Sequence, residues 1–250
     1  MPPDIAIIIP VYNEGANILP LTRELLAALG PQVRSCEVVF VDDASTDNTW
    51  EQIRQARDLD PRVRGLRHDR NSGQSAALWT GLQATASPIV ATLDGDLQND
   101  PADLPRLLTE LEHAELVCGV RSKRQDNFVR RASSAVARWA RRLVLGVDFA
   151  DSGCSLRAFK RSALAGVFPF HGFHRFLPIL VQGGGATTRE LAVNHRPRVA
   201  GVSKYGVWNR LGRGVVDLLA MAWYQKRRLR PTRFTELPDP DGKGSTRPEV

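Results

Sequence analysis

The chain has 250 residues, of which 42% are hydrophobic and 24% are charged, and this composition excludes a mainly disordered or fibrous protein. Its formal net charge of +7 favours an anionic partner, such as phosphate groups, nucleic acid or a membrane surface. Three cysteines without a CxxC pair argue against a disulfide framework and against structural zinc.

The sequence favours a cytoplasmic location. Its few cysteines are typical of a reduced protein. No stretch approaches the roughly 18 apolar residues of a membrane span, and the N-terminus lacks the basic-then-apolar order of a signal peptide. We therefore expect no segment of this chain to cross a bilayer.

Short apolar runs alternate with segments of helical period in the first half of the chain. Such alternation is typical of βαβ units, which place a parallel sheet between two layers of helices. We therefore expect an α/β fold with a mostly parallel sheet flanked by helices, in which residues 1–122 form one half. The predicted strands lie at residues 5–12, 36–43, 63–69, 88–96 and 115–121, and the predicted helices at residues 16–29, 48–59, 75–86 and 101–113.

The second half, residues 123–228, is less regular, and we assign residues 1–228 to a single domain. The remaining residues, 229–250, contain too few apolar side chains to pack, and we expect them to be disordered. The elements expected in the second half are a basic helix over residues 128–145, a stretch rich in glycine and phenylalanine, a strand over residues 188–193 and an amphipathic helix over residues 205–228.

Polar motifs follow three of the predicted strands. They are PVYNE (residues 10–14), DDAST (residues 42–46) and DGDLQ (residues 94–98). In a parallel sheet, ligands bind at the carboxyl ends of the strands, where loops and helix N-termini meet. The three motifs therefore predict one cleft that is rich in carboxylates.

The motif Asp94-Gly-Asp96 has two interpretations. An Asp-Gly pair is a common turn, whereas closely spaced carboxylates are stable where a cation lies among them. A calcium loop of the EF-hand type does not fit, because glycine is missing at the sixth position and the twelfth residue is Pro105. What fits is Mg²⁺ or Mn²⁺ that is shared with the phosphates of a nucleotide.

Both interpretations can hold together. Gly95 supplies a turn that lets Asp94 and Asp96 face the same ion. Asp100 then belongs to the next element, as the N-cap of the following helix with Pro101 at its first position.

Asp42 and Asp43 also allow two interpretations. Residues 45–47 can cap the helix that follows and so explain part of the polarity. Two adjacent carboxylates exceed what capping needs, and a carboxylate at this place can accept hydrogen bonds from a ribose or a base edge. In PVYNE, Glu14 or Asn17 can equally belong to a helix start.

The order PVYNE, VDDASTD, HDRNSGQSAALWTGLQAT, LDGDLQND and GVR resembles the family-2 glycosyltransferases with a GT-A (Rossmann-like) fold. The match covers about residues 5–228 and is most similar to the branch that includes dolichol-phosphate mannosyltransferase and bacterial polyprenyl-phosphate glycosyltransferases. The resemblance implies a metal site of Asp94, Asp96 and Gln98 and catalytic roles for Asp96 and Arg121. It implies nucleotide-sugar binding by Pro10, Tyr12, Glu14, Asp42, Asp43 and Asp94.

The basic helix is either a solvated arginine face or a surface for phosphate and membrane. Arg130, Ser134, Arg138 and Arg141 or Arg142 share one face of it. A basic amphipathic helix with tryptophan is typical of an anionic membrane surface. By similarity to the branch, the acceptor phosphate or the donor diphosphate is held by Arg121, Arg130, Ser134, Arg157, Arg198 and Lys204.

The resemblance implies inverting, metal-dependent transfer of a sugar from GDP-mannose or a UDP-sugar to a polyprenyl monophosphate. Such an acceptor is already an anion, so it needs no general base. One alternative is a family-2 transferase that acts on a hydroxyl of a polysaccharide or glycolipid. A remote alternative is a nucleic-acid-binding protein, which is disfavoured because the cleft is acidic and the arginines are not interleaved with aromatic residues.

The last predicted helix carries an apolar stripe and ends on KRRLR. The stripe either packs on the core or lies at a membrane interface, where aromatic and basic residues are enriched. We expect peripheral attachment to the inner face of the cell membrane, either alone or with a separate membrane protein. The stripe consists of Trp208, Leu211, Val215, Leu218, Leu219 and Trp223.

Overall fold

The computed structural model describes residues 3–30, 35–121, 138–197 and 207–228, the last of these without the side chains of residues 207–215. The predicted tail and residues 128–137 of the predicted basic helix lie outside the described residues. The rest of that predicted helix, residues 138–145, is helical.

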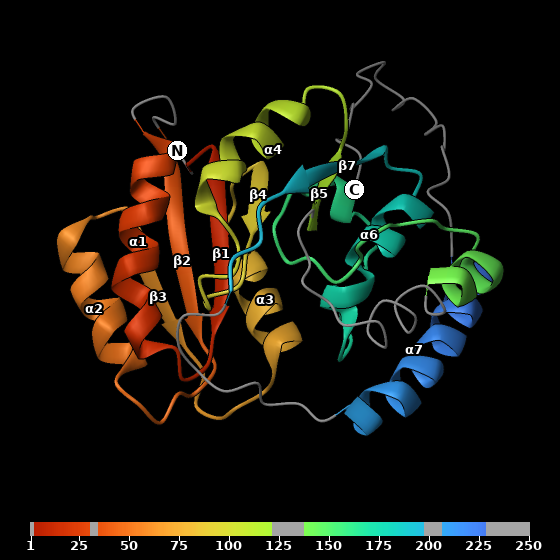
Figure 1. Ribbon diagram of the computed structural model, residues 1–250, viewed down its shortest axis with the longest axis horizontal. Helices are drawn as coiled ribbons and strands as arrows, with labels where there is room; N and C mark the ends of the chain where they lie inside the picture. The colour runs from red at the N-terminus through yellow and green to blue at the C-terminus, as the bar shows by residue number, and fades with distance from the viewer. Residues whose placement is uncertain (1–2, 31–34, 122–137, 198–206, 229–250) are drawn as a thin grey trace, which may run out of the picture.

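One sheet of seven strands organises the described part of the chain, in the order β3-β2-β1-β4-β6-β5-β7 (Figure 1). Neighbouring strands are parallel except at β6, which runs antiparallel to both β4 and β5. The predicted mostly parallel α/β sheet is therefore confirmed. The strands are β1 (Ile5–Val11), β2 (Cys36–Asp42), β3 (Val63–Arg67), β4 (Ile89–Thr92), β5 (Leu116–Arg121), β6 (Arg157–Lys160) and β7 (Thr188–Val193).

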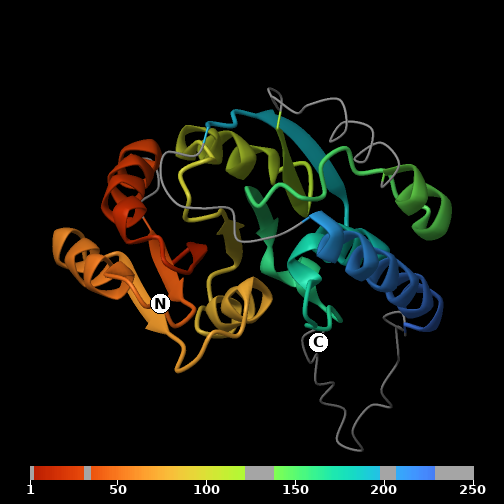
Figure 2. The same cartoon turned by 60° about the horizontal axis from the view of Figure 1, so that its bottom comes forward.

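Helices cover both faces of the sheet (Figures 1 and 2). The helices α1, α2 and α4 pack on one face, and α3, α6 and α7 pack on the other. Their bounds are α1 (Gly15–Leu29), α2 (Thr49–Leu59), α3 (Gln74–Gln83), α4 (Leu104–Glu110), α6 (Phe173–Gly183) and α7 (Val207–Arg227), with short 3-10 helices η1 (Pro101–Asp103) and η2 (Arg161–Leu164).

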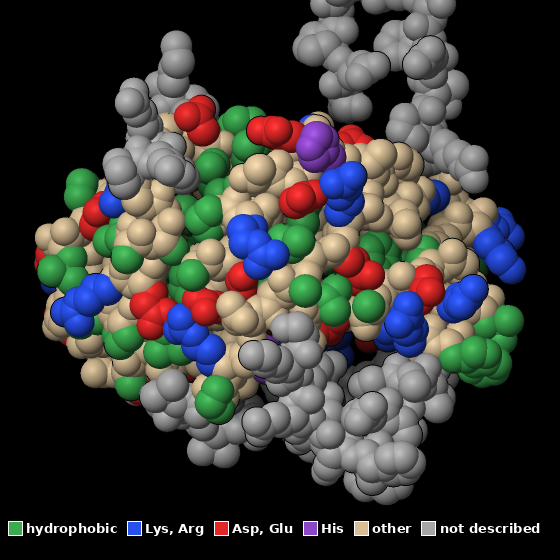
Figure 3. Space-filling view, turned by 45° about the horizontal axis from the view of Figure 1, so that its top comes forward, with side chains coloured by type: hydrophobic (Ala, Val, Ile, Leu, Met, Phe, Trp, Pro, Cys, Tyr) green, Lys and Arg blue, Asp and Glu red, His purple; other side chains and the backbone are tan. Residues whose placement is uncertain are grey.

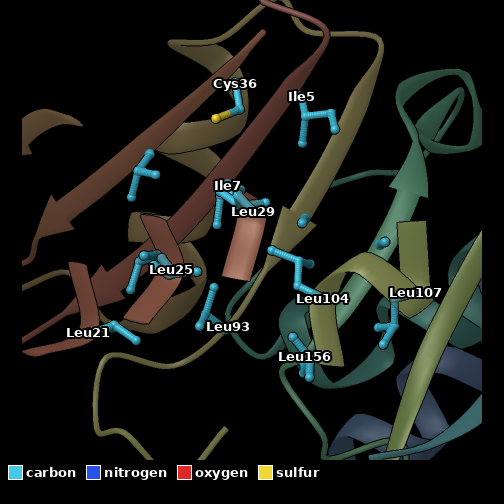
Figure 4. Packing of buried hydrophobic residues seen from close by; sticks show 14 of the residues in the cluster. Ile5, Ile7, Leu21, Leu25, Leu29, Cys36, Leu93, Leu104, Leu107 and Leu156 are labelled. Atoms are coloured by element: carbon cyan, nitrogen blue, oxygen red, sulfur yellow. The ribbon is translucent and has the colours of Figure 1, made fainter. Parts of the chain in front are cut away.

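Successive residues of β1 contribute to two different cores. Ile7 joins the core on the α1 face, where it lies near Leu29 and Leu25 (Figure 4). Ile8 joins the core on the opposite face together with Leu78 of α3. Because helices cover both faces, the strand is apolar at successive positions and does not alternate between apolar and polar residues.

Two elements of the second half, β6 and α6, were not predicted from the sequence. Helix α6 contains Pro178, which lacks the N–H that would bond to the carbonyl of His174 four residues earlier. Arg157 of β6 replaces that donor, because its Nη1 donates to the His174 carbonyl at 2.5 Å. The helix depends on a distant strand, so its local sequence did not reveal it.

The last two predicted elements are confirmed. Strand β7 coincides with the expected residues 188–193, and α7 lies within the expected residues 205–228. Among the described residues, no helix combines the length and the apolar character that crossing a bilayer requires.

Candidate active site

The three polar motifs meet at the carboxyl ends of β1, β2 and β4, which are neighbours in the sheet. Each motif contains one non-glycine residue with a positive φ, namely Asn13 (54°), Ala44 (60°) and Leu97 (60°), and the described residues include no others. Such backbone conformations cost about 1–3 kcal/mol each and concentrate at functional sites. The fold thus gathers three strained loops where the sequence predicts a cleft.

Hydrogen bonds join the loop after β1 to the loop after β2. The Asn13 N–H donates to Ser45 Oγ at 2.9 Å, and the Glu14 N–H donates to Thr49 Oγ1 at 2.9 Å. Glu14 directly precedes α1, and its Oε2 accepts from Asn17 Nδ2 at 2.6 Å within the first turn. Of the two residues considered for the helix start, Glu14 therefore marks it.

Asp42 is fully buried at the end of β2. Its Oδ1 accepts from the Ser45 N–H at 2.9 Å, and its Oδ2 lies 3.2 Å from Arg67 Nε. The guanidinium of Arg67 lies over the ring of Trp50, 5.6 Å from its centroid. Asp42 thus connects its own loop to β3 and, through Arg67, to α2; its predicted contact with a nucleotide stays a prediction.

Asp43 holds the start of α3. Its Oδ1 hydrogen-bonds with the Ser72 N–H and with His68 Nδ1, both at 2.8 Å, and its Oδ2 accepts from the Gly73 N–H at 2.7 Å. Gly73 has a φ of 88°, which favours glycine. A carboxylate at this place satisfies N–H groups that a helix start leaves unpaired. Asp43 therefore has a structural role that the sequence analysis missed, and its nucleotide contact stays a prediction.

Asp94 and Asp96 lie in the turn after β4. Asp96 is buried and its Oδ1 accepts from the Gln98 N–H at 3.2 Å, whereas Asp94 is partly exposed. A Cβ atom at Gly95 would lie 2.5 Å from Val11 Cγ1, so the close approach of this turn to β1 requires glycine. The three predicted metal ligands thus share one tight turn at the edge of the sheet.

The charges at this turn fit a divalent cation. Although Asp94 is partly exposed, the surrounding protein displaces water from its carboxyl group and so raises its pKa. The negative charge of Asp96 raises this pKa further, against the opposing charges of Arg157 and Arg121. A cation relieves such repulsion, and oxygens of carboxylates and amides are ligands that Mg²⁺ and Mn²⁺ prefer. The described residues contain no group of three or more His, Cys, Asp or Glu side chains that could hold a metal. A cation here would therefore rely on few protein ligands and on substrate phosphates.

The residues after the metal motif brace it. Asn99 is buried, and its Oδ1 accepts from the Asp94 N–H at 3.2 Å and from Ser155 Oγ at 2.9 Å. Asp100 accepts from the Ala102 N–H at 3.1 Å, with proline at the first position of η1. The expectation that Asp100 caps the next helix is therefore confirmed.

Arg121, the predicted catalytic arginine, is the last residue of β5 and pairs with Asp151. Its Nε and Nη2 donate to the two carboxylate oxygens at 2.6 and 2.8 Å, and both side chains are largely buried. Glu190 of β7 in turn accepts from the Ala150 N–H at 2.9 Å, which holds the loop that carries Asp151. A bidentate pair fixes the plane of the guanidinium, so Asp151 sets the orientation of Arg121.

Arg157 lies buried at the start of β6. Besides its bond to the His174 carbonyl, its Nη2 donates to the Ser152 carbonyl at 2.8 Å. Arg157 thus joins α6 to the loop before β6, close enough for its charge to act on Asp94. Its predicted contact with phosphate stays a prediction.

The other predicted phosphate ligands, Arg130, Ser134, Arg198 and Lys204, lie outside the described residues. On the described part of the basic helix, Arg138 Nε pairs with Asp148 at 2.5 Å. On the face shown in Figure 3, acidic and basic side chains are interspersed, so the net charge forms no single basic patch there.

The model of the family described as "Glycosyl transferase family 2" matches residues 6–168, which include the three polar motifs, Arg121 and Arg157. This chain belongs to glycosyl transferase family 2. The predicted family and the predicted enzyme class, glycosyltransferase, are therefore confirmed.

Two relatives place this glycosyltransferase within its family. A dodecaprenyl-phosphate galacturonate synthase from Rhizobium johnstonii is 35% identical over 237 residues, which cover 92% of this chain and 70% of the relative. An undecaprenyl-phosphate 4-deoxy-4-formamido-L-arabinose transferase from Shewanella sediminis is 37% identical over 207 residues, which cover 82% of this chain and 62% of that relative. The predicted resemblance to the polyprenyl-phosphate branch is confirmed by these relatives.

Solved structures agree with the fold of this glycosyltransferase. A mannosyltransferase from Pyrobaculum calidifontis, in complex with GDP-Man and Mn²⁺, matches with a TM-score of 0.66 at 21% identity and covers 92% of this chain and 66% of its own. A glucosyl-3-phosphoglycerate synthase from Mycobacterium tuberculosis, in complex with Mn²⁺, UDP and phosphoglyceric acid, matches with a TM-score of 0.67 at 20% identity and covers 92% of this chain and 80% of its own. At these identities the likeness shows the fold.

Gln74 is a residue of the glycosyltransferase site that the sequence analysis did not single out. It begins α3, and its Nε2 donates to Asp94 Oδ1 at 2.8 Å. The signal for it was the motif HDRNSGQSAALWTGLQAT, which contributed to the family resemblance without assigning a role to any of its residues.

A second missed feature is a partly buried polar contact between α3 and α6. Ser75 Oγ lies 2.7 Å from His174 Nδ1 and accepts from the Gly172 N–H at 2.8 Å. Burial, together with the positive charges of Arg175 and Arg157, lowers the pKa of His174 to about 3. His174 is therefore neutral at physiological pH and joins the two helices as a hydrogen-bonding group.

Proposed function

We propose that this glycosyltransferase moves a sugar from a nucleotide sugar to a polyprenyl monophosphate. The carboxylate pair Asp94 and Asp96 supports the proposal, because both lie in one turn after β4 and the positive charge of Arg121 acts on Asp94. The names of two relatives specify polyprenyl-phosphate products or acceptors. GDP-mannose and UDP-sugars are both candidates for the donor.

Asp94, Asp96 and Gln98 are the residues that would hold Mg²⁺ or Mn²⁺. Such a cation, when bound, supplies positive charge that stabilises the leaving nucleoside diphosphate. Asp96 is held by the Gln98 N–H and Asp94 by the Gln74 amide, so both carboxylates are oriented before a ligand arrives. Arg121, oriented by Asp151, adds a fixed positive charge for a phosphate group.

The acceptor chemistry follows from its charge. A phosphate monoester attacks as an anion, so no side chain has to remove a proton from it. His174, whose pKa is lowered to about 3, is a weak base and fits a structural role. We propose direct displacement with inversion at the anomeric carbon, which NMR of the product would test through the configuration of the new bond.

Helix α7 supports action at a membrane surface. Its apolar stripe divides between two environments: Leu218 packs beside the buried Met221 on the core, whereas Leu219 and Trp223 are 61% and 66% exposed. The last turn carries Lys226 and other basic side chains. Packing on the core therefore describes Leu218, and exposure at a membrane interface fits Leu219 and Trp223.

A second helix, residues 138–145, lies at the same end of the molecule as α7 (Figures 1 and 2). On residues 138–145, Trp139 and Leu143 are 63% and 69% exposed. Exposed tryptophan and leucine with arginine nearby are typical of helices in a lipid interface. We propose that this end attaches the enzyme to the inner face of the cell membrane, alone or with a separate membrane protein.

The transfer reaction is tested with labelled UDP- and GDP-sugars, polyprenyl phosphate and Mn²⁺. We expect label in a lipid that mild acid cleaves, and we expect it to require both the phosphate acceptor and the cation. Label in a glycolipid or polysaccharide, with polyprenyl phosphate unlabelled, would contradict the proposal and favour a hydroxyl acceptor. A thermal-shift series with the same nucleotides identifies the base, because a ligand stabilises the state that binds it.

A further inference from the structure

Residues 194–197 leave β7 at the edge of the sheet and return to the metal motif. In Figure 1 they run from β7 toward the ends of β4 and β1. His195 and Asn99 form an antiparallel β-bridge, and the Asn194 N–H donates to Asp103 Oδ2 at 2.7 Å. A segment from the second half of the chain therefore lies directly against the residues that follow the metal carboxylates.

Within this segment, Arg196 contacts the metal motif directly. Its main-chain N–H donates to the Gln98 carbonyl at 2.9 Å, and its main-chain carbonyl accepts from Gln98 Nε2 at 3.4 Å. Its guanidinium pairs with Asp100 at 2.7 Å and with Glu24 of α1 at 2.6 Å. Arg196 thus contacts the metal motif at Gln98 and just beyond it at Asp100, and anchors both to α1.

The loop that Arg196 contacts is one that needs external support. Leu97 has a φ of 60°, and a non-glycine residue keeps such a backbone conformation only where the surroundings fix it. The contact with the Arg196 carbonyl also orients the Gln98 amide. Its nitrogen faces Arg196, which leaves Oε1 as the atom for a cation.

We propose that Arg196 is a positioning residue for the divalent cation. Its guanidinium, paired with Glu24 and Asp100, fixes the main-chain segment that bonds to Gln98, and that segment keeps Gln98 and the strained turn in the conformation that presents their oxygens. This role rests on the proposed metal-dependent transfer. Partners of metal-binding groups commonly change metal affinity by about 10- to 100-fold when they are replaced. The inference therefore predicts a loss of cation affinity, and not only a loss of activity.

The test compares Arg196→Ala with Arg189→Ala. Arg196→Ala removes the ion pairs with Glu24 and Asp100 and keeps the main-chain bonds to Gln98, so it tests whether the ion pairs hold that segment in place. Arg189 also lies in the second half of the chain and forms an arginine–glutamate ion pair of 2.7 Å, with Glu110, but at the opposite end of β7 from the metal motif. Mn²⁺ is titrated into each protein with UDP or GDP present, and the signal of free Mn²⁺ is followed by electron paramagnetic resonance. Transfer rates are measured over the same range of Mn²⁺.

We expect Arg196→Ala to weaken Mn²⁺ binding by about tenfold, to raise the Mn²⁺ concentration for half-maximal rate in parallel, and to recover most of its rate at saturating Mn²⁺. Arg189→Ala should match the wild type in all three. Unchanged Mn²⁺ binding by Arg196→Ala, beside a wild type that binds Mn²⁺, would overturn the inference and leave the proposed function intact. A wild type that transfers sugar without binding Mn²⁺ would overturn the metal part of the proposed function and the inference with it.

Two milder variants apply if Arg196→Ala melts well below the wild type. Glu24→Gln removes one ion pair of Arg196. Arg196→Lys keeps the positive charge but lacks the planar guanidinium that pairs with Glu24 and Asp100 at the same time. The positioning role is supported if both variants melt normally and bind Mn²⁺ more weakly than the wild type, with a smaller loss of affinity for Arg196→Lys than for Arg196→Ala. Mn²⁺ affinity that stays at the wild-type value in both variants overturns it.

Discussion

Two regions of the molecule are built in opposite ways. One is the sheet edge, by which we mean the carboxyl ends of β1, β2 and β4, and the other is the end formed by residues 138–145 and α7. At the sheet edge, polar side chains such as Asp43 and Asp96 are buried and bonded to neighbouring backbone. At the other end, Trp139 and Trp223 are exposed on helices. A small charged ligand requires groups that are fixed in advance, whereas a fluid lipid surface requires only apolar area. Substitutions at the first region should therefore change chemistry, and those at the second should change location.

The largest effect is expected at the carboxylate pair. Asp96→Ala should reduce transfer by about 100-fold or more, because it removes charge from the group that would hold the cation. Initial rates and melting curves are measured together. Asp58→Ala, at an exposed carboxylate of α2, is the control and should transfer normally. Normal melting and normal turnover of Asp96→Ala would end the metal argument.

A second substitution at the sheet edge tests the orientation of Arg121. Asp151→Ala removes both acceptors of a buried guanidinium, and a charge-assisted hydrogen bond contributes about 1.5–3 kcal/mol, so kcat/KM should fall about 10- to 100-fold. Asp148→Ala breaks the more exposed pair with Arg138 and should change kcat/KM little. Equal effects of the two substitutions would show that Asp151 does not orient Arg121.

Membrane attachment through residues 138–145 and α7 is tested by placing negative charge at exposed apolar positions of α7. Leu219→Asp with Trp223→Asp should weaken flotation with anionic vesicles about tenfold or more, because burial of such side chains contributes roughly 1.5–3 kcal/mol each. Transfer to an acceptor dissolved in detergent should stay near the wild-type rate. Leu59→Asp, at an exposed leucine of α2, is the matched control. Flotation that is unchanged in the double variant would contradict the membrane role of this end.

The smallest effect is expected at His174, between the two regions. Its pKa of about 3 in the folded protein lies below the usual value of 6.5, so the unfolded chain binds the extra proton between these values. Stability is therefore lost as the pH falls below about 6.5, by roughly 1.4 kcal/mol at pH 5.5. His174→Gln keeps a partner for Ser75 and should flatten this loss. Unfolding in denaturant at pH 7.5 and 5.5 measures it, and an equal loss in both proteins would exclude His174 as its source.

The sequence located the carboxylates of the site but not the bonds that hold them. Asp94 and Asp96 directly follow an apolar strand, so their place at the end of that strand can be predicted from the neighbouring residues alone. The partners of Asp43, the N–H groups of Ser72 and Gly73, are distant in sequence and become neighbours only through the packing of α3. The contacts of Asp43 could therefore not be predicted from its own motif.

The same reason explains the missed elements. Strand β6 is four residues long and lies between two other strands, so its sequence RAFK carries no alternating pattern. Helix α6 contains Pro178, which locally argues against a helix. The parallel part of the sheet was predictable around β1 and β2, because these seven-residue strands are mostly apolar and almost wholly buried. The part where β6 reverses direction has no such signal.

The contact between Arg157 and the carbonyl that Pro178 leaves without a helical partner also limits the order in which these residues can change. Replacing Arg157 first leaves the partly buried His174 carbonyl without its donor, which is costly. Replacing Pro178 with alanine first restores a helical N–H to that carbonyl, after which the arginine is less necessary for the helix. The two positions are therefore expected to be epistatic in their effect on the stability of α6.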